Sequence, residues 1–352
     1  MVKVLVAMNV IVFLAMLADG AGLMQPNSAV HLRWGANFGP LTKEGEWWRL
    51  LACTFLHFGL IHLAMNMWVL WGAGGLVERL YGNATFLAIY LFAGLTGSFA
   101  SLYWNADMVV SAGASGAVFG VYGALAAYVL REPGSVPKSV LKSLTGSTLA
   151  FLVYSIAFGA VVTAIDNAAH AGGLAGGFLA GMLLARPLAP RAPLSFGRAG
   201  LATVGAVLVL GAVLGALFAL VPAAKYSYAA QQTAAAAIKA FSAQEEQLAK
   251  AAAALVEARK TGRITDAQLG EGIERELLPG WNAAHARFAA ISLEDGAPAA
   301  SSLRLMTEFV AARRDMFAEY AAGMKTGDAA RLRRADELAA EALRLMKVMR
   351  GG

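Results

Sequence analysis

The chain has 352 residues, of which 58% are hydrophobic and 15% are charged, and its mean hydropathy is +0.57. A water-soluble protein of this length is not so apolar, so the composition indicates several membrane spans. The net charge of +6 is spread along the chain, without a basic stretch interleaved with aromatic residues, which argues against a nucleic-acid partner. A single cysteine, Cys53, excludes an internal disulfide, a CxxC redox pair and a cysteine zinc cage.

Charged residues are distributed unevenly between two parts of the chain. Residues 1–222 hold 18 of the 52 Asp, Glu, Lys and Arg residues, and residues 223–352 hold the other 34. We therefore expect an all-α protein in which a polytopic helical membrane bundle is followed by a soluble α-helical domain.

Seven apolar segments are long enough to cross ~30 Å of hydrocarbon. The first also resembles a signal peptide, since Lys3 precedes a short apolar core. The fifth is the weakest, because serine, threonine and lysine residues dilute it. The predicted spans are residues 2–18, 55–77, 84–104, 113–130, 140–160, 168–186 and 199–222.

Lysine and arginine residues in the connections predict the orientation of the chain. The connections after the second, fourth and sixth spans carry basic residues, whereas those at residues 105–110 and 161–167 carry none. We therefore expect the basic connections, and with them the N-terminus, on the cytoplasmic side. The long first connection, residues 19–54, departs from this rule because it carries three basic residues and yet lies outside.

Polar side chains of three predicted spans fall at one depth. His62 and Asn66 lie in the outer half of the second span, and their separation of four residues puts them on one helix face. Ser115 lies near the first turn of the fourth span and His170 near the first turn of the sixth, and both spans enter from outside. We expect all four side chains in the same outer layer of the membrane, where polar groups are costly and usually functional.

Ser115 and His170 have the chemistry of nucleophilic catalysis. Serine is a weak nucleophile unless a base lies within ~2.6–3.2 Å, and His170 is the candidate base. His62, Asn66 and the backbone N–H of Ser115 are candidate donors to the oxyanion of a tetrahedral intermediate. The structural alternatives are a packing serine, an interhelical histidine, and a polar pair that joins the second span to the fourth. Ser111 is a second candidate nucleophile, without flanking glycines.

Glycine residues follow both Ser115 and His170 at helical spacing. Such small-residue faces let helix backbones approach closely, which a contact between the two side chains requires. The glycines are Gly116 and Gly120 in the fourth span and Gly173, Gly177 and Gly181 in the sixth.

Four motifs, in this order, resemble those of the rhomboid intramembrane serine proteases. They are Trp48-Arg49, HFGLIHLAMN with His62 and Asn66, GASG with Ser115, and AHAGGLAGG with His170. The resemblance covers about residues 1–190 and implies a six-span catalytic unit with a Ser–His dyad. The dyad of this family has no acidic third member, so we expect Asp166 to cap the sixth span rather than to complete a triad.

The resemblance also implies the reaction and its substrates. Rhomboid proteases cut single-pass membrane proteins near the outer membrane face, and the fifth span and residues 161–167 would act as lateral gate and lid. Phe119 stands where the family often has a tyrosine that stacks on the base, so the stacking face is kept and the hydroxyl is lost. The alternative function is that of a non-catalytic rhomboid-like binder or escort, which usually lacks the serine or the histidine.

No cofactor or metal is expected. The sequence has no His-Glu-x-x-His motif, and no pair of aspartates lies within the spans. Of the other histidines, His57 is expected to be structural at the entrance of the second span, and His31 and His285 are expected to be solvated.

The last part of the chain resembles an addition to the six-span core. Residues 191–222 form a linker and a seventh span, as in the six-plus-one rhomboid arrangement, and place residues 223–352 outside a bacterial inner (plasma) membrane. Breaks in the Ala-rich sequence of this tail predict about four helices, with a capping box at Thr265 and Gln268 and an N-cap at Asp328. Substrate recruitment, self-association and simple anchoring remain open as its role.

Overall fold

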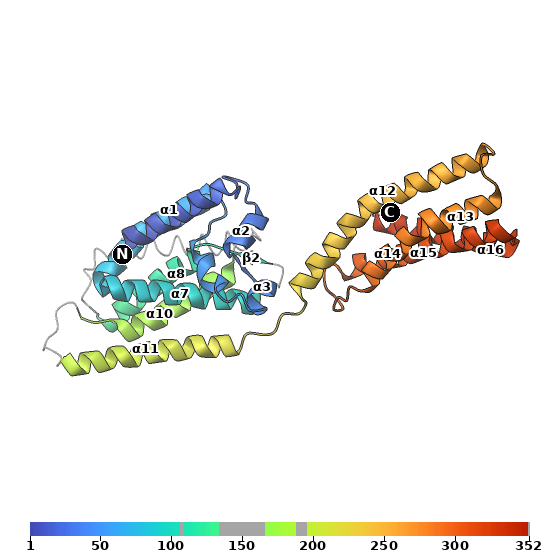
Figure 1. The fold of residues 1–352 in the computed structure, drawn as a ribbon. Coiled ribbons are helices and arrows are strands. Elements are labelled where there is room, and N and C mark those ends of the chain that lie inside the picture. Colours follow the sequence, from blue (N-terminus) through green and yellow to red (C-terminus); the bar gives the residue numbers. More distant parts are fainter. Residues whose placement is uncertain (106–108, 134–165, 188–195, 351–352) are drawn as a thin grey trace. The chain divides into compact units, whose positions relative to one another are not determined.

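A computed structural model describes residues 1–105, 109–133, 166–187 and 196–350 of the protein (Figure 1). The chain divides into two compact units, Met1–Ala224 and Lys225–Gly352. Within the described residues, the regular secondary structure is helical apart from one pair of two-residue antiparallel strands, β1 (Asn37–Phe38) and β2 (Val110–Ser111). The predicted all-α class is confirmed.

The helices of the first unit follow the predicted spans. The fifth predicted span, residues 140–160, lies outside the described residues. The second span is continued by a short π-helical segment, η2, between two α-helices. The elements are α1 (Val2–Ala18), α5 (Leu60–Val69), η2 (Leu70–Gly74), α6 (Gly75–Tyr81), α7 (Asn83–Trp104), α8 (Ser115–Arg131), α10 (Asn167–Leu184) and α11 (Phe196–Ala219).

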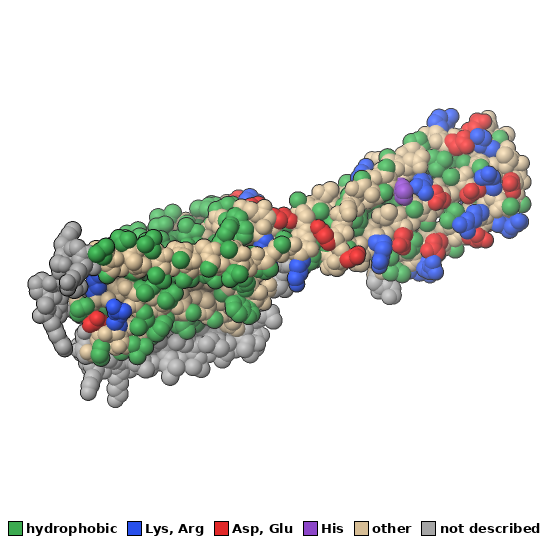
Figure 2. Space-filling model, turned by 90° about the horizontal axis from the view of Figure 1, so that it is seen from below, with side chains coloured by type: hydrophobic (Ala, Val, Ile, Leu, Met, Phe, Trp, Pro, Cys, Tyr) green, Lys and Arg blue, Asp and Glu red, His purple; other side chains and the backbone are tan. Residues whose placement is uncertain are grey.

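Several of these helices have the length and composition of membrane spans. Within the described ranges, three are long and apolar enough to cross a bilayer: Leu60–Tyr81, Asn83–Trp104 and Gly200–Ala219. The helices α1 and α8 are apolar but shorter, at 17 residues each. Figure 2 shows the consequence for the surface: hydrophobic side chains dominate the visible face of the first unit, and charged ones gather on the second.

The core of the first unit is built on very close contacts of α10 with α8 and α7. A Cβ atom added to Gly173 would lie 2.0 Å from the carbonyl oxygen of Gly116, and one added to Gly177 would lie 2.0 Å from that of Gly120. Only glycine permits this approach, so the predicted small-residue faces are confirmed. The Thr96 hydroxyl of α7 adds a 3.0 Å hydrogen bond to the carbonyl oxygen of Gly172.

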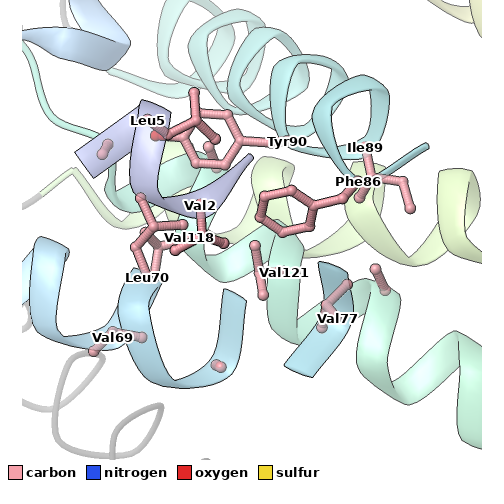
Figure 3. Close-up of a cluster of buried hydrophobic side chains, with 14 of the residues drawn as sticks. Val2, Leu5, Val69, Leu70, Val77, Phe86, Ile89, Tyr90, Val118 and Val121 are labelled. Carbon is pink, nitrogen blue, oxygen red and sulfur yellow. The ribbon is translucent and has the colours of Figure 1, made fainter. Parts of the chain in front are cut away.

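Large side chains fill the space on the other side of α8. The cluster in Figure 3 joins α1, the second span, α7 and α8, and it buries aromatic and branched residues fully or nearly so. It fixes the helix that carries Ser115 against the N-terminal half of the unit. Its members include Val2, Leu5, Leu70, Phe86, Tyr90, Val118 and Val121.

The long first connection folds into short helices over the membrane core. Arg49 organises it: its buried guanidinium donates to the carbonyl oxygens of Leu32 (2.6 Å) and Ala36 (3.1 Å) and pairs with Glu46 (2.7 Å). The following cysteine, Cys53, is also buried, with its Sγ 3.2 Å from the Ser98 hydroxyl of α7. These elements are α2 (Ser28–Trp34), α3 (Gly39–Lys43), α4 (Arg49–Ala52) and η1 (Cys53–Phe55).

The expectation that His31 is solvated is wrong. Its side chain is fully buried, with Nδ1 2.9 Å from the carbonyl oxygen of Asn27 and Nε2 3.0 Å from that of His57. The ring also stacks on Phe58 at 4.5 Å. Because α2 is folded down onto the entrance of the second span, a residue in a polar stretch of sequence becomes part of the core.

The seventh span, α11, packs along α7 while most of its surface is exposed. The Tyr103 hydroxyl of α7 donates to the carbonyl oxygen of Leu217 at 2.5 Å, and the Trp47 ring lies 4.6 Å from that of Phe218. Side chains such as Leu201 and Leu208 are about 70% exposed. A helix so apolar and so exposed is suited to hydrocarbon rather than water.

Over residues 225–350, the second unit is a bundle of five helices around an aromatic core. Trp281 is 1% exposed, and its ring packs with those of Phe241, Phe309 and Phe317. Phe241 packs in turn with Phe288. The helix is interrupted at Leu277, between α13 and α14, and the sequence pattern of the tail does not predict this interruption. The helices are α12 (Tyr228–Lys260), α13 (Asp266–Glu276), α14 (Leu278–Ala289), α15 (Ala300–Thr326) and α16 (Ala329–Met349).

Both predicted helix starts in this unit are confirmed. Thr265 and Gln268 form a reciprocal capping box at α13, and the Asp328 carboxylate accepts from the backbone N–H groups of Ala330 and Arg331 at α16. Each cap satisfies donors that the first turn of a helix leaves without intrahelical acceptors.

Candidate active site

Ser115 is the first residue of α8, directly after a sharp turn of the backbone. Gly113 has φ +142°, and a Cβ atom there would lie 2.7 Å from Cε1 of His62, so the turn requires glycine. The Gly113 N–H donates to the carbonyl oxygen of Cys53 at 2.9 Å, which ties the turn to the first connection. As the first helical residue, Ser115 has a backbone N–H with no acceptor inside its helix, beside the positive end of the helix dipole.

His170 lies in the first turn of α10, opposite Ser115. Its Nε2 is 2.8 Å from the Ser115 Oγ, and the imidazole is 7% exposed. Phe119, one turn after Ser115 on α8, stacks on the His170 ring with a centroid distance of 4.2 Å and an interplanar angle of 8°. The glycine contacts between α8 and α10 bring the two helix backbones close enough for this short side-chain distance.

His62 of α5 lies beside the turn at Gly113, and Asn66 lies one turn further along the same face of α5. The Phe58 backbone N–H donates to Nδ1 of His62 at 3.3 Å, so a neutral His62 carries its proton on Nε2, the atom that lies beside Gly113. Asn66 is buried and donates one amide hydrogen to the carbonyl oxygen of His62 at 2.9 Å, which leaves its second amide hydrogen for another acceptor. His62 therefore presents an N–H donor beside Gly113, and Asn66 has one amide hydrogen to spare on the same face of α5.

His57 is a buried structural residue beside the site, as expected at the span entrance. The Ala114 backbone N–H points to its Nε2 at 3.5 Å, and its carbonyl oxygen accepts from the His31 ring. The Ala114 N–H, just before Ser115, is thus directed at a side chain from the entrance of the second span.

Asp166 caps α10 and has a second contact that sequence reasoning missed. Its Oδ1 accepts from the backbone N–H of Ala169 at 2.9 Å, which confirms the predicted capping role. Its Oδ2 accepts from the Ser111 hydroxyl at 2.5 Å. Within the described part of the chain, Nδ1 of His170 has no hydrogen-bond partner, so Asp166 does not complete a triad. Ser111 donates to a carboxylate rather than facing a histidine, which disfavours it as a nucleophile.

Among the described residues, no three His, Cys, Asp or Glu side chains are grouped so that they could hold a metal ion. The chemistry available at this site is that of a hydroxyl, an imidazole and N–H donors.

Comparison with known proteins identifies the family. Residues 44–187 match the sequence model of the Rhomboid domain. The chain is 36% identical over 213 residues to "Rhomboid protease GluP" of Bacillus subtilis (strain 168), which covers 60% of this chain and 39% of that protein. It is 32% identical over 189 residues to "Rhomboid protease AarA" of Providencia stuartii (48% of this chain, 66% of that protein). It is also 36% identical over 167 residues to "RHOMBOID-like protein 5" of Arabidopsis thaliana (47% and 53%).

These matches cover between 39% and 66% of the relatives' own lengths. The matched region of this chain contains every candidate site residue, from His62 on α5 to His170 on α10. The helical membrane fold, the motifs and the domain match agree, and the chain belongs to the rhomboid family.

Proposed function

We propose that this protein is an intramembrane serine endopeptidase in which Ser115 is the nucleophile and His170 the general base. The observation that carries the proposal is the 2.8 Å separation of Ser115 Oγ and His170 Nε2 on two helices packed through glycine. This is the distance at which an imidazole can accept the hydroxyl proton as the oxygen attacks a carbonyl. Phe119 limits the tilt of the imidazole, although without the hydroxyl that a tyrosine would add.

The reaction follows from these positions. Ser115 Oγ bonds to the scissile carbonyl carbon while its proton passes to His170 Nε2, and the carbonyl oxygen becomes an oxyanion. Three donors face that charge: Nε2–H of His62, the amide of Asn66 and the backbone N–H of Ser115. The imidazolium then protonates the leaving amine, and the acyl-enzyme is hydrolysed by a water molecule that His170 deprotonates in turn.

The substrates are single-pass membrane proteins, which approach through the bilayer. Two relatives are named as rhomboid proteases, and their shared family supports this substrate class. A peptide bond can reach Ser115 only if the substrate helix unwinds locally, because a helical carbonyl is already hydrogen-bonded within its own chain. A gate formed by the fifth span and residues 161–167 is part of this proposal; the fifth span and residues 161–165 lie outside the described residues.

The proposed setting is a bacterial plasma membrane with the N-terminus in the cytoplasm. The distribution of basic residues supports this orientation. It places the site near the outer face and residues 223–352 on the same side, where they are available for substrate recruitment or self-association. A periplasm-restricted reporter fused after Gly352 should be active, and a silent reporter would reverse the placement of the tail.

The activity is tested with purified full-length protein and a single-span substrate that has small residues near its outer membrane boundary. Wild type should cleave, and Ser115→Ala and His170→Ala should each lower kcat at least about 10³-fold. A fluorophosphonate should label wild type and Ser101→Ala, a control in which a buried serine of α7 is changed, but not Ser115→Ala. If wild type cleaves no better than the two variants, the protein is a rhomboid-like binder or escort.

A further inference from the structure

Ser111 and Asp166 meet at the ends of the two segments that carry the reacting side chains. Ser111 ends β2, four residues before Ser115, and Asp166 is the N-cap of α10, four residues before His170. The Ser111 Oγ–Asp166 Oδ2 distance is 2.5 Å, and both side chains are part-buried. The hydrogen bond therefore joins the two segments at their starts.

The same two residues are fixed independently on each side of that hydrogen bond. Val110 and Ser111 pair with Phe38 and Asn37 of β1, so the strand is held by the first connection. The other carboxylate oxygen of Asp166 accepts from Ala169, so the carboxylate is rigidly attached to the first turn of α10. Because both groups are fixed on their own segments, the hydrogen bond between them constrains the distance between the two segments.

The glycine contacts set the distance between α8 and α10, and this hydrogen bond adds a restraint on their sliding and rotation. Gly116–Gly173 and Gly120–Gly177 set how closely α8 and α10 approach, and both contacts lie further along the helices than Ser115 and His170. A link at the entrance of both helices restrains those motions where Ser115 and His170 face each other. Catalysis is sensitive to this, because a misplacement of about 1 Å can lower a rate by ~10²-fold.

We propose that Ser111 and Asp166 form a clasp that sets the position of His170 relative to Ser115, and that both are positioning residues for the reaction. This inference rests on the proposed function. The carboxylate is a better acceptor in this role than a neutral group, because hydrogen bonds to ionised acceptors are shorter and stronger. Its negative charge one turn before His170 also favours the imidazolium formed during attack.

Three variants separate the parts of the clasp. Ser111→Ala removes only the hydrogen bond between the segments and leaves the cap of α10 in place. Ser111→Thr keeps the hydroxyl. Asp166→Asn keeps an equally good N-cap and retains polar groups on both sides, but removes the charge.

The measurement is kcat and KM for a single-span substrate, together with the rate constant of fluorophosphonate labelling at Ser115. Ser111→Ala should lower kcat and the labelling rate about tenfold with KM within about twofold of wild type, because the substrate still binds while the dyad is misaligned. Ser111→Thr should restore both rates to within about threefold of wild type. Asp166→Asn should fall between wild type and Ser111→Ala.

Ser101→Ala is the matched control. It is also a serine-to-alanine change in the membrane unit, and it removes the acceptor of a 3.1 Å side-chain hydrogen bond from Asn105 without touching the site. It should leave kcat and the labelling rate unchanged.

The outcomes distinguish the clasp from the activity on which it rests. If wild type neither cleaves nor labels, the proposed function fails. If wild type is active and Ser111→Ala matches it, or Ser111→Thr is as slow as Ser111→Ala, the clasp is wrong. The clasp is equally wrong if Ser111→Ala raises KM and leaves kcat unchanged, or if Ser101→Ala slows the labelling to the same extent.

Discussion

Both units of this protein are helical, but the helices within each unit are held together by different kinds of contact. In the first unit, the closest helix pair meets backbone to backbone, with Gly173 and Gly177 of α10 against Gly116 and Gly120 of α8. In the second, large side chains such as Trp281 fill most of the core, and a glycine-to-backbone contact is present between Gly270 of α13 and Ala321 of α15, where an added Cβ atom would lie 2.6 Å from the carbonyl oxygen. The difference follows from the solvent: lipid does not drive apolar side chains together, so close packing and hydrogen bonds must hold membrane helices, whereas water makes the burial of aromatic area favourable.

The largest effect is expected where a glycine contact is blocked. Gly173→Val would place a branched side chain on the backbone of Gly116, which cannot move aside as a flexible side chain would. We expect destabilisation by about 3 kcal/mol or more, with loss of substrate cleavage. The check is thermal unfolding of the purified protein in detergent, followed by the cleavage assay.

Gly205→Val on α11 is the control for this change, because a Cβ atom at Gly205 meets nothing within 4 Å. It should unfold at the temperature of wild type. Equal melting temperatures for the two valine variants would contradict the view that backbone contact holds α8 and α10 together.

The second unit should instead be sensitive to the loss of a large side chain. Trp281→Ala should destabilise it by ~3–5 kcal/mol, since the vacated volume is enclosed by other helices. Limited proteolysis should then cut the tail at lower temperatures, while fluorophosphonate labelling of Ser115 stays as in wild type because the units have separate cores. Leu343→Ala, at a position 52% exposed, is the control and should leave proteolysis unchanged. Parallel loss of labelling and tail protection would show that the units depend on each other.

A polar contact between membrane helices should matter less than either packing contact. Tyr103→Phe removes the hydroxyl that donates to the carbonyl oxygen of Leu217 and leaves the ring in place. We expect a destabilisation of about 1 kcal/mol, visible as a small decrease in melting temperature in detergent. An unchanged melting temperature would mean that apolar contacts alone hold α11 on α7.

The smallest effect concerns charge on the surface of the second unit. Hydrogen bonding to the Arg259 guanidinium lowers the pKa of Asp266 in the folded state. The pair therefore stabilises the fold at pH values above the ordinary carboxyl range, and this contribution is lost as the pH falls through the lowered pKa. In Asp266→Asn, the melting temperature should fall slightly less between pH 7 and pH 3 than it does in wild type, as measured by thermal melts across this range. If the variant and wild type show the same dependence of melting temperature on pH, the pair is not a source of acid sensitivity.

The sequence predicts those features of the first unit that depend only on the order and spacing of residues along the chain. A run of apolar residues long enough for the bilayer marks each described span, and counting spans places Ser115 and His170 at one depth. The glycine spacing then predicts which faces meet. The caps at Thr265 and Asp328 were predictable for the same reason, since a helix start depends on residues three positions apart.

Features that depend on how a long connection folds back were not predictable. His31 looks like a surface residue until α2 is placed against His57, and the bond between Ser111 and Asp166 joins residues 55 positions apart. The division between α13 and α14 was missed because Leu277 lies in an uninterrupted helical pattern, and only Pro279 two residues later indicates a restart. Roles for the site residues, the domain boundaries and the orientation stay predictions.

The burial of Cys53 has a practical consequence for mapping that orientation. Its sulfur is enclosed between the first connection and Ser98, so a membrane-impermeant maleimide added to intact cells has no native thiol within reach. A cysteine introduced at the exposed residue Leu343 would then be the sole reactive position. Modification from the medium, with the membrane left intact, would report directly which side of the bilayer the tail occupies.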